Sequence, residues 1–152
     1  MNSLSDKGSE DPFNLTRFVD VQSHSFKIAQ AEIRQGRKRT HWMWFIFPQI
    51  AGLGHSDMSR RYAISSLAEA QAYLAHPVLG DRLRMCVAAL QDLGALTAEQ
   101  VFGAVDAQKL ASSLTLFSVA GGGQIFDAAL ARWFGNPDSK TLEILGINPK
   151  LS

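Results

Sequence analysis

The chain has 152 residues, which is enough for one ordinary domain with a sizeable hydrophobic core. Its composition, 46% hydrophobic and 19% charged, is typical of a globular protein and excludes a wholly disordered one. Fifteen basic residues against 14 acidic ones give a net charge of +1, so no large field marks a nucleic-acid or membrane partner.

The single cysteine, Cys86, excludes an internal disulfide and a zinc site built from cysteines. The first ten residues are polar and lack the apolar segment of a secretory signal. No apolar run approaches the ~20 residues that are needed to cross a bilayer. We therefore expect a cytoplasmic protein, with residues 1–10 as a disordered N-terminal tail and residues 11–152 as a single helical domain.

Two helices are expected before residue 36. Asp11 can cap the first, with Pro12 in its first turn, and the second should cover residues 25–35. Gly36 can end this second helix by adopting the left-handed conformation that other residues resist. Cations are favoured at this negative end of the helix dipole, where the sequence places Arg34, Arg37, Lys38 and Arg39.

A run of six apolar residues, 42–47, follows the basic cluster and stops at Pro48. Thr40 can cap a short helix over residues 41–47, although a run of this length also fits a buried strand. We favour the helix because strong helical patterns lie on both sides of the run. Residues 49–58 contain two glycines and should form an ordered loop.

In the rest of the chain, capping residues and prolines mark the predicted helix starts, and glycines mark the predicted helix ends. Asp106, for example, can cap the helix that runs to about residue 119. No segment alternates with a period of two, so the expected class is all-α, a compact multi-helix domain of roughly seven to eight helices with short ordered loops. The later helices are expected over residues 66–75, 77–93, 97–103, 106–119, 125–134 and 139–145.

The motifs of several common enzyme classes are missing. The sequence has no phosphate-binding loop of the type Gly-x-x-x-x-Gly-Lys, no dinucleotide fingerprint and no His-Glu-x-x-His zinc motif. A segment around Gly52, Gly54 and Ser56 looks superficially like a nucleophile elbow, but its serine is misplaced and no strand precedes it. The histidines lack metal-ligand spacing, so we expect neither a metal nor a cofactor.

His41, beside Trp42 and Trp44, is the most suggestive chemical group. An imidazole at the base of an aromatic wall can exchange a proton or orient a substrate. The alternative is a histidine whose nitrogens bond within the fold, in an aromatic run that is simply core. The basic cluster before it can hold a phosphate or carboxylate, or it can be a solvated helix end.

A second polar group, Lys109 with Ser112 and Ser113, projects from one helical turn. A lysine near two hydroxyls suits a small anion, whereas serines that bond to the surface or to their own helix are the alternative. Cys86 lies on an apolar stripe and is expected to be a core residue rather than a nucleophile.

Several segments of the chain carry a family signature. They are Asp11-Pro12-Phe13-Asn14-Leu15, Arg17-Phe18, the segment from Gly36 through His41-Trp42-Met43-Trp44 to Phe47-Pro48-Gln49, Gly52-Leu53-Gly54, Tyr62-Ala63-Ile64, His76-Pro77, Leu79-Gly80, Phe102-Gly103 and the segment from Lys109-Leu110 through Ser112-Ser113 to Leu116-Phe117. On these segments, over residues 11–146, the chain resembles the bacterial family filed as domain of unknown function 1810. That resemblance implies a mainly helical fold and an uncharacterised activity. Members are often labelled calpastatin, but calpain inhibitors of that name are long, disordered and repetitive, unlike this chain. Residues 23–25 depart from the family, because a proline is expected there to start the second helix.

These patterns lead to three hypotheses. The first is a pocket that binds or hydrolyses a small anionic, nucleotide-like ligand, with Lys38 and Lys109 holding the anion, Trp44 stacking and His41 as the candidate catalytic residue. The second is a non-enzymatic interaction module whose signature polar residues are structural. The third, a nucleic-acid binder, is the weakest because the charge is balanced. The sequence leaves open whether the protein is an enzyme and what its oligomeric state is. The ligand-binding candidates are Arg17, Lys38, His41, Trp44, Gln49, Lys109 and Ser113.

Overall fold

Helices account for most of residues 11–147, the part of the chain that the computed structural model describes. Nine helices over these residues confirm the all-α class and lie close to the predicted seven to eight. The predicted tail at residues 1–10 and the last five residues, 148–152, lie outside the described range. The helices are α2 (Thr16–Arg34), α3 (Met43–Ile46), α4 (Asp57–Arg61), α5 (Leu67–Ala75), α6 (Leu79–Gln91), α7 (Ala98–Phe102), α8 (Ala104–Val119), α9 (Gln124–Trp133) and α10 (Ser139–Leu145).

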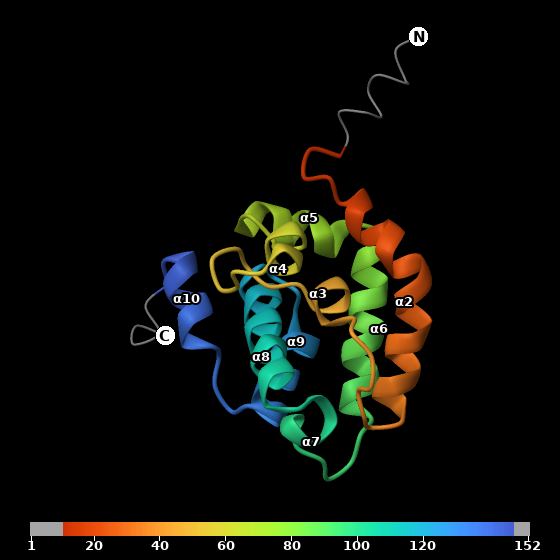
Figure 1. The fold of residues 1–152 in the computed structure, drawn as a ribbon. Helices are drawn as coiled ribbons and strands as arrows, with labels where there is room; N and C mark the ends of the chain where they lie inside the picture. Colours follow the sequence, from red (N-terminus) through yellow and green to blue (C-terminus); the bar gives the residue numbers. More distant parts are fainter. Residues whose placement is uncertain (1–10, 148–152) are drawn as a thin grey trace.

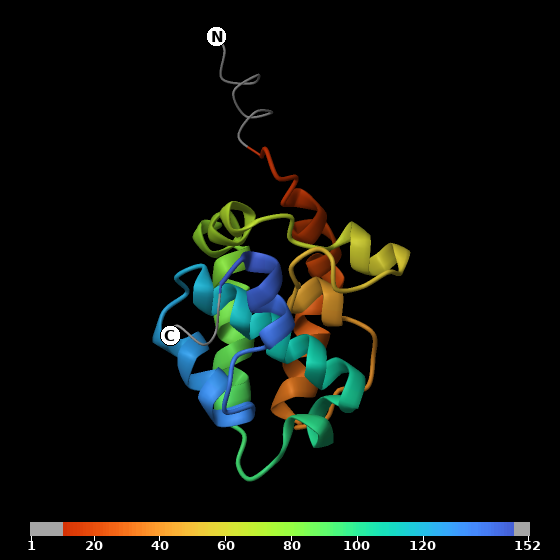
Figure 2. The ribbon, with the colours of Figure 1, turned by 90° about the vertical axis from the view of Figure 1, so that its left-hand side faces the viewer.

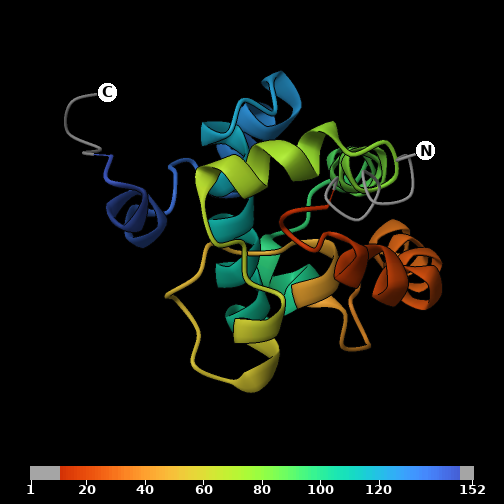
Figure 3. The same cartoon turned by 90° about the horizontal axis from the view of Figure 1, so that it is seen from above.

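Two long helices, α2 and α6, pack side by side, and α8 packs against α9 next to them (Figure 1). α5 crosses above this arrangement, and α10 lies on the outer side of α8 (Figures 2 and 3). The short helix α3 sits in the middle, where it contacts α2, α6 and α8. None of the helices described has the length and apolar character of a membrane span.

A row of aromatic rings crosses the core and joins four helices. The ring centroids of Phe18 and Tyr73 are 5.3 Å apart, and those of Tyr73 and Phe117 are 5.2 Å apart. Phe126 continues the row at 6.0 Å from Phe117. These separations lie in the range that aromatic pairs prefer, and all four side chains are fully buried. The row therefore ties α2, α5, α8 and α9 together.

The predicted break at residues 23–25 is wrong, because α2 runs continuously from Thr16 to Arg34. Serine usually favours turns, but here Ser23 donates to the carbonyl of Asp20 at 2.6 Å and Ser25 to that of Val21 at 2.9 Å. The hydroxyls are thus satisfied inside the helix. With no glycine or proline in this stretch, one buried stripe continues through it.

The first helix also starts later than Asp11 predicts. The Asp11 carboxylate still acts at the start of the helix, since it accepts bonds from the backbone N–H groups of Leu15 at 2.7 Å and Thr16 at 3.2 Å. Asn14, which lies between Asp11 and Leu15, has a φ of +54°, an uncommon conformation for a residue with a side chain. The loop therefore turns once more before α2 begins.

The apolar run forms a helix of only four residues, Met43–Ile46, instead of the predicted 41–47. Thr40 does not cap it, because the Thr40 hydroxyl donates to Glu32 at 2.8 Å. Phe47 leaves the helix with a φ of −125° and a ψ of 73°, as expected for a residue that precedes proline. The run is buried on one side only, so Trp44 remains half-exposed.

Local caps explain why the later helices agree with the sequence. Ser66 accepts a bond from the Glu69 N–H, a complete capping box joins Thr97 to Gln100, and Asp138 caps α10. α8 differs, because it starts at Ala104 after Gly103, and Asp106 is not its cap. The predicted loop over residues 49–58 also misses α4, a five-residue helix.

Cys86 on α6 is a core residue, as predicted, with none of its surface exposed. Burial raises the pKa of its thiol from 9.0 to about 12. The thiolate that a nucleophile needs is therefore scarce at neutral pH. Gly80 on the same helix permits close packing, since a Cβ there would lie 2.2 Å from the carbonyl oxygen of Leu74.

Candidate functional site

A buried carboxylate, that of Glu32 on α2, fixes the segment that leads into α3. Glu32 is only 7% exposed, and it accepts bonds from the backbone N–H groups of Arg39 at 2.7 Å and Thr40 at 3.1 Å. The indole N–H of Trp42 donates to the same oxygen at 2.9 Å. Burial alone would raise the pKa of Glu32, but the bonds from Arg39, Trp42 and Thr40 outweigh it and lower the pKa from 4.5 to about 2. The carboxylate thus stays ionised and holds residues 39–42 in place.

A triad of charges lies where this segment meets α8. The Lys38 ammonium is 2.9 Å from one oxygen of Asp106, and the Lys109 ammonium is 3.3 Å from the other. Burial would raise the pKa of the Asp106 carboxyl group, but its hydrogen bonds and ion pairs with Lys38 and Lys109 lower it. Lys109 also sits over the Trp44 ring, 4.2 Å from its centroid. One carboxylate therefore serves two ammonium groups.

Two hollows open beside this triad, with volumes of about 630 and 360 Å³. Both are bounded by Trp44, Ala104, Val105 and Lys109, so they lie next to each other, and we call the two together the Trp44 groove. Its larger part lies between residues 49–59 and the outer face of α8, and its smaller part lies beside the segment that Glu32 fixes.

Five of the seven predicted ligand-binding residues line the Trp44 groove. Lys38 and His41 border its smaller part, and Gln49 borders its larger part. Trp44 and Lys109 stand between the two parts. His41 is exposed, and its ring has no hydrogen-bond partner among residues 11–147. The structure therefore brings these five of the seven residues to the same groove.

The structure does not bring Arg17 to the groove. It borders a separate hollow of about 500 Å³ beside α5. Its five N–H groups bond to the carbonyls of Phe13, Asn14, Arg61 and Ala63 and to the Glu69 carboxylate. Glu69 is almost completely buried and also accepts from the Ser65 N–H at 2.8 Å. Arg17 thus joins the start of α2 to α5.

Ser113 is the second predicted residue that lies apart from the groove. It is fully buried in α8, and its hydroxyl has no hydrogen-bond partner among the described residues. Its neighbour Ser112 borders the groove instead, with a hydroxyl 2.7 Å from that of Thr141 on α10.

Sequence reasoning missed several residues that build the site. Asp106 looked like a helix cap, although its spacing of three from Lys109 is a signal for an ion pair on one helix face. Glu32 is a charge beside the buried Ala29 and Ile33, and a charge on an apolar stripe signals a buried partner. Nothing local to Val105 or Lys140 marks them as part of a groove.

The charged side chains that border the groove have one more positive charge than negative charges. Lys38, Lys109 and Lys140 face two carboxylates, Asp106 and Asp138. The Asp138 carboxylate caps α10, because it accepts hydrogen bonds from the Thr141 N–H at 3.0 Å and from the Thr141 hydroxyl. Within residues 11–147, no group of three or more His, Cys, Asp or Glu could hold a metal ion.

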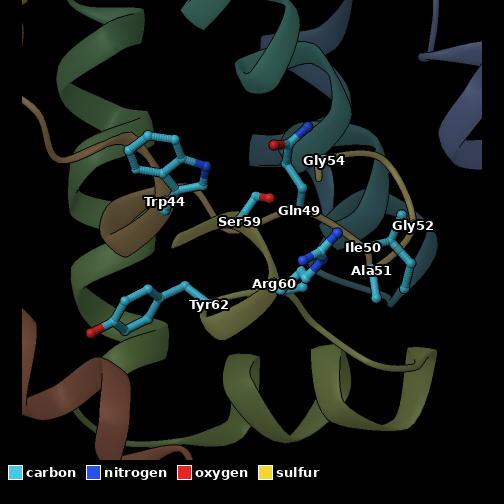
Figure 4. A pocket seen from close by; sticks show the side chains of 10 residues that line it. Trp44, Gln49, Ile50, Ala51, Gly52, Gly54, Ser59, Arg60 and Tyr62 are labelled. Carbon is cyan, nitrogen blue, oxygen red and sulfur yellow. The ribbon is translucent and has the colours of Figure 1, made fainter. Parts of the chain in front are cut away.

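A small niche opens from the larger part of the groove. Its volume is about 120 Å³, and it shares Trp44, Gln49, Gly54 and Ser59 with the groove. Figure 4 shows the indole nitrogen of Trp44 and the side chains of Gln49 and Ser59 facing one another across it. We call this space the Gln49 niche.

Comparison with curated proteins finds no significant match. Among solved structures, the chain is similar to the crystal structure of the conserved hypothetical protein Rv1873 from Mycobacterium tuberculosis. The two chains share 46% sequence identity with a TM-score of 0.88, and the match covers 91% of this chain and 100% of the mycobacterial one. A model of the protein family of unknown function DUF1810 matches residues 12–145. The chain therefore belongs to the DUF1810 family.

Proposed function

We propose that the Trp44 groove binds a small anionic ligand. The observation that carries this proposal is the triad in which Lys38 and Lys109 share the single carboxylate of Asp106. Lys38, whose side chain is only 8% exposed, is paired with Asp106 at 2.9 Å and donates to the carbonyl of Thr40. The second ammonium group, that of Lys109, is left to share the same carboxylate at 3.3 Å, so the triad has a net positive charge. A bound phosphate or carboxylate would supply the missing negative charge.

The shape and walls of the groove fit a small organic molecule better than a bare ion. A space of several hundred cubic ångströms lies in the range of ligand pockets. The indole of Trp44 provides a planar wall between the two parts, and Val105 and Leu53 add apolar surface. We expect Lys109, at the centre, to hold the anion, and Lys38 to support it.

His41 is the residue that could add chemistry to binding. Its ring is exposed at the smaller part of the groove, on the segment that Glu32 positions. An imidazole in such a place can donate a proton to a bound ligand or accept one from it. We therefore keep His41 as the candidate proton donor or acceptor if the protein is an enzyme.

A thermal-shift screen with phosphates, nucleotides and carboxylates tests the proposal. A ligand at 100 times its dissociation constant should stabilise the protein by about 2.7 kcal/mol. We expect Lys109→Met to reduce that stabilisation strongly, because it removes the central ammonium. The matched control is Lys27→Met, which removes an exposed lysine from α2 and should leave it unchanged. No shift with any anion, or equal losses in both variants, would refute the proposal.

Replacing His41 by alanine should change the free energy of unfolding by less than about 0.5 kcal/mol, because the exposed ring makes no hydrogen bond within the described residues. Urea unfolding of the variant checks this. A loss above 1.5 kcal/mol would instead indicate the structural role that the second hypothesis gives to the signature residues.

One observation favours a protein-interaction module as the second candidate function. Val105 at the groove is 71% exposed and Ile144 on α10 is 45% exposed, and exposed apolar side chains can mark a partner surface. Ile144→Asp should then abolish association with a partner without reducing the thermal shift caused by an anion, because Ile144 does not border the groove. Unchanged association in this variant would refute the second candidate function.

A further inference from the structure

Two polar side chains at the Gln49 niche, those of Trp44 and Gln49, have no hydrogen-bond partner within residues 11–147. Of the three tryptophans, Trp42 donates its indole N–H to Glu32 and Trp133 donates to Gln91, each at 2.9 Å. The indole N–H of the half-exposed Trp44 has no partner within residues 11–147. The half-buried amide of Gln49 also has none, whereas the amide of Gln22 bonds to Phe45 and Tyr73.

The unpaired groups form a specific pattern of donors and acceptors. Trp44 offers a donor, and Gln49 offers both a donor and an acceptor. The Ser59 hydroxyl donates its proton to the carbonyl of Ser56 at 2.9 Å, so its oxygen faces the niche as an acceptor. An amide-type group, which carries a carbonyl beside an N–H in one plane, complements this pattern on both sides.

The size and lining of the niche favour a neutral group. A volume of about 120 Å³ is well above the ~10–15 Å³ that one water needs, so a planar amide can enter. Much of the wall is made by Ile50, Tyr62 and the Trp44 ring, where a carboxylate would lose hydration. The one cation at this wall, Arg60, is exposed and hydrated, which weakens its pull on an anion.

The same indole connects this niche to the charge triad. One face of the Trp44 ring is covered by the Lys109 ammonium, and its N–H edge borders the niche. The two features are therefore separated by little more than one side chain. A single small ligand can reach both.

We infer that the ligand is bifunctional, with an anionic end at Lys109 and a neutral amide-type head, either a carboxamide or a cyclic imide, in the Gln49 niche. This inference rests on the proposed anion site. The head would accept hydrogen bonds from Trp44 and Gln49. A carboxamide has two N–H groups to donate to Gln49 and Ser59, whereas a cyclic imide donates its single N–H to one of them. Nucleobases with an imide edge and nicotinamide share this chemistry.

Four phosphates test the inference by NMR titration of the tryptophan indole N–H signals. Ribose 5-phosphate carries the anion alone, nicotinamide ribonucleotide adds a carboxamide, uridine 5′-monophosphate adds an imide, and nicotinate ribonucleotide adds a carboxylate. We expect ribose 5-phosphate to bind weakly and at least one amide-type probe to bind at least about tenfold more tightly, the gain of one or two hydrogen bonds. The Trp44 signal should move and the Trp133 signal should not.

Two variants isolate the niche from the anion site. Trp44→Phe keeps an aromatic ring but removes the N–H, and Gln49→Leu removes the amide. Measured by thermal shift, because Trp44→Phe has no Trp44 signal, each should lose the roughly tenfold advantage of the amide-type probe and retain the affinity for ribose 5-phosphate. Trp133→Phe is the control, because its N–H bonds to Gln91 away from the groove. The remaining indole signals report whether each variant is folded.

The outcomes distinguish failure of the amide-type head from failure of the proposed anion site. Equal affinity for all four phosphates, or tighter binding of nicotinate ribonucleotide than of the amide-type probes, overturns the amide-type head and leaves the anion site standing. If ribose 5-phosphate and every other probe leave the Trp44 signal unmoved, both the inference and the proposed anion site fail.

Discussion

Glu32→Gln should lower the free energy of unfolding by about 3 kcal/mol at pH 7. The carboxylate accepts four bonds from Arg39, Thr40 and Trp42, and bonds to a charged group contribute about 1.5–3 kcal/mol each in a buried setting. The glutamine keeps the shape but replaces one oxygen by an NH₂ group that faces other donors. Urea unfolding measures the loss, and Glu143→Gln on the exposed face of α10 is the matched control.

The contribution of Glu32 also has a defined pH dependence. Its pKa is about 2 in the folded protein against an ordinary value of 4.5, so the unfolded chain takes up the proton first as the pH falls. The stabilisation is therefore complete above the ordinary pKa and is lost between about pH 5 and pH 2. The difference between the two pKa values corresponds to about 3 kcal/mol. A gap between wild type and Glu32→Gln that stays constant from pH 7 to pH 3 would contradict this role.

Holding residues 39–42 in place gives Glu32 an indirect part in the proposed site. Lys38 and His41 both lie on or beside the segment that it fixes. In Glu32→Gln we therefore expect weaker anion binding as well as lower stability. Lys109→Met, in contrast, should weaken binding with a smaller loss of stability. The Lys109 side chain is partly exposed, and in its absence the Asp106 carboxylate still pairs with Lys38.

Sequence reasoning succeeded where the deciding interactions are local. The caps at Ser66 and Thr97 bond to residues three positions away, so their patterns can be read directly from the chain. Gly36 was predicted to end a helix in the left-handed conformation, and it follows the end of α2 with a φ of +76°. These signals place the helices, and the apolar stripes then determine which faces are buried.

The failures involve partners that are distant in sequence. Asp106 resembles a cap, but it pairs with Lys38 from the segment before α3, and only the packing of α8 against that segment reveals it. Ser23 and Ser25 suggested a break that the buried stripe of α2 overrides. Arg17 and Glu69, 52 residues apart, form a pair that no local pattern marks. The grouping around Trp44 was predictable in part because four of its five members lie within residues 38–49.

Arg17→Met should destabilise the protein by about 3–5 kcal/mol, the second large effect. The substitution leaves the Glu69 carboxylate, whose side chain is only 3% exposed, without its ion-pair partner at 2.9 Å. It also leaves four backbone carbonyls without the guanidinium that joins the start of α2 to the chain before α5. Urea unfolding gives the loss, and Arg61→Met, which removes an exposed arginine nearby, should cost less than about 0.5 kcal/mol.

The double variant Arg17→Met with Glu69→Gln separates the ion pair from the other bonds of Arg17. Neutralising Glu69 removes the unpaired buried charge, so the double variant should be more stable than the sum of the two single losses predicts. Because Arg17 lies at a different hollow from Trp44, the thermal shift caused by an anion should be the same in Arg17→Met as in wild type. If Arg17→Met unfolds in a cooperative transition but shows no thermal shift with the anion, Arg17 belongs to the ligand site. The hollow beside α5 would then be the place where the ligand binds.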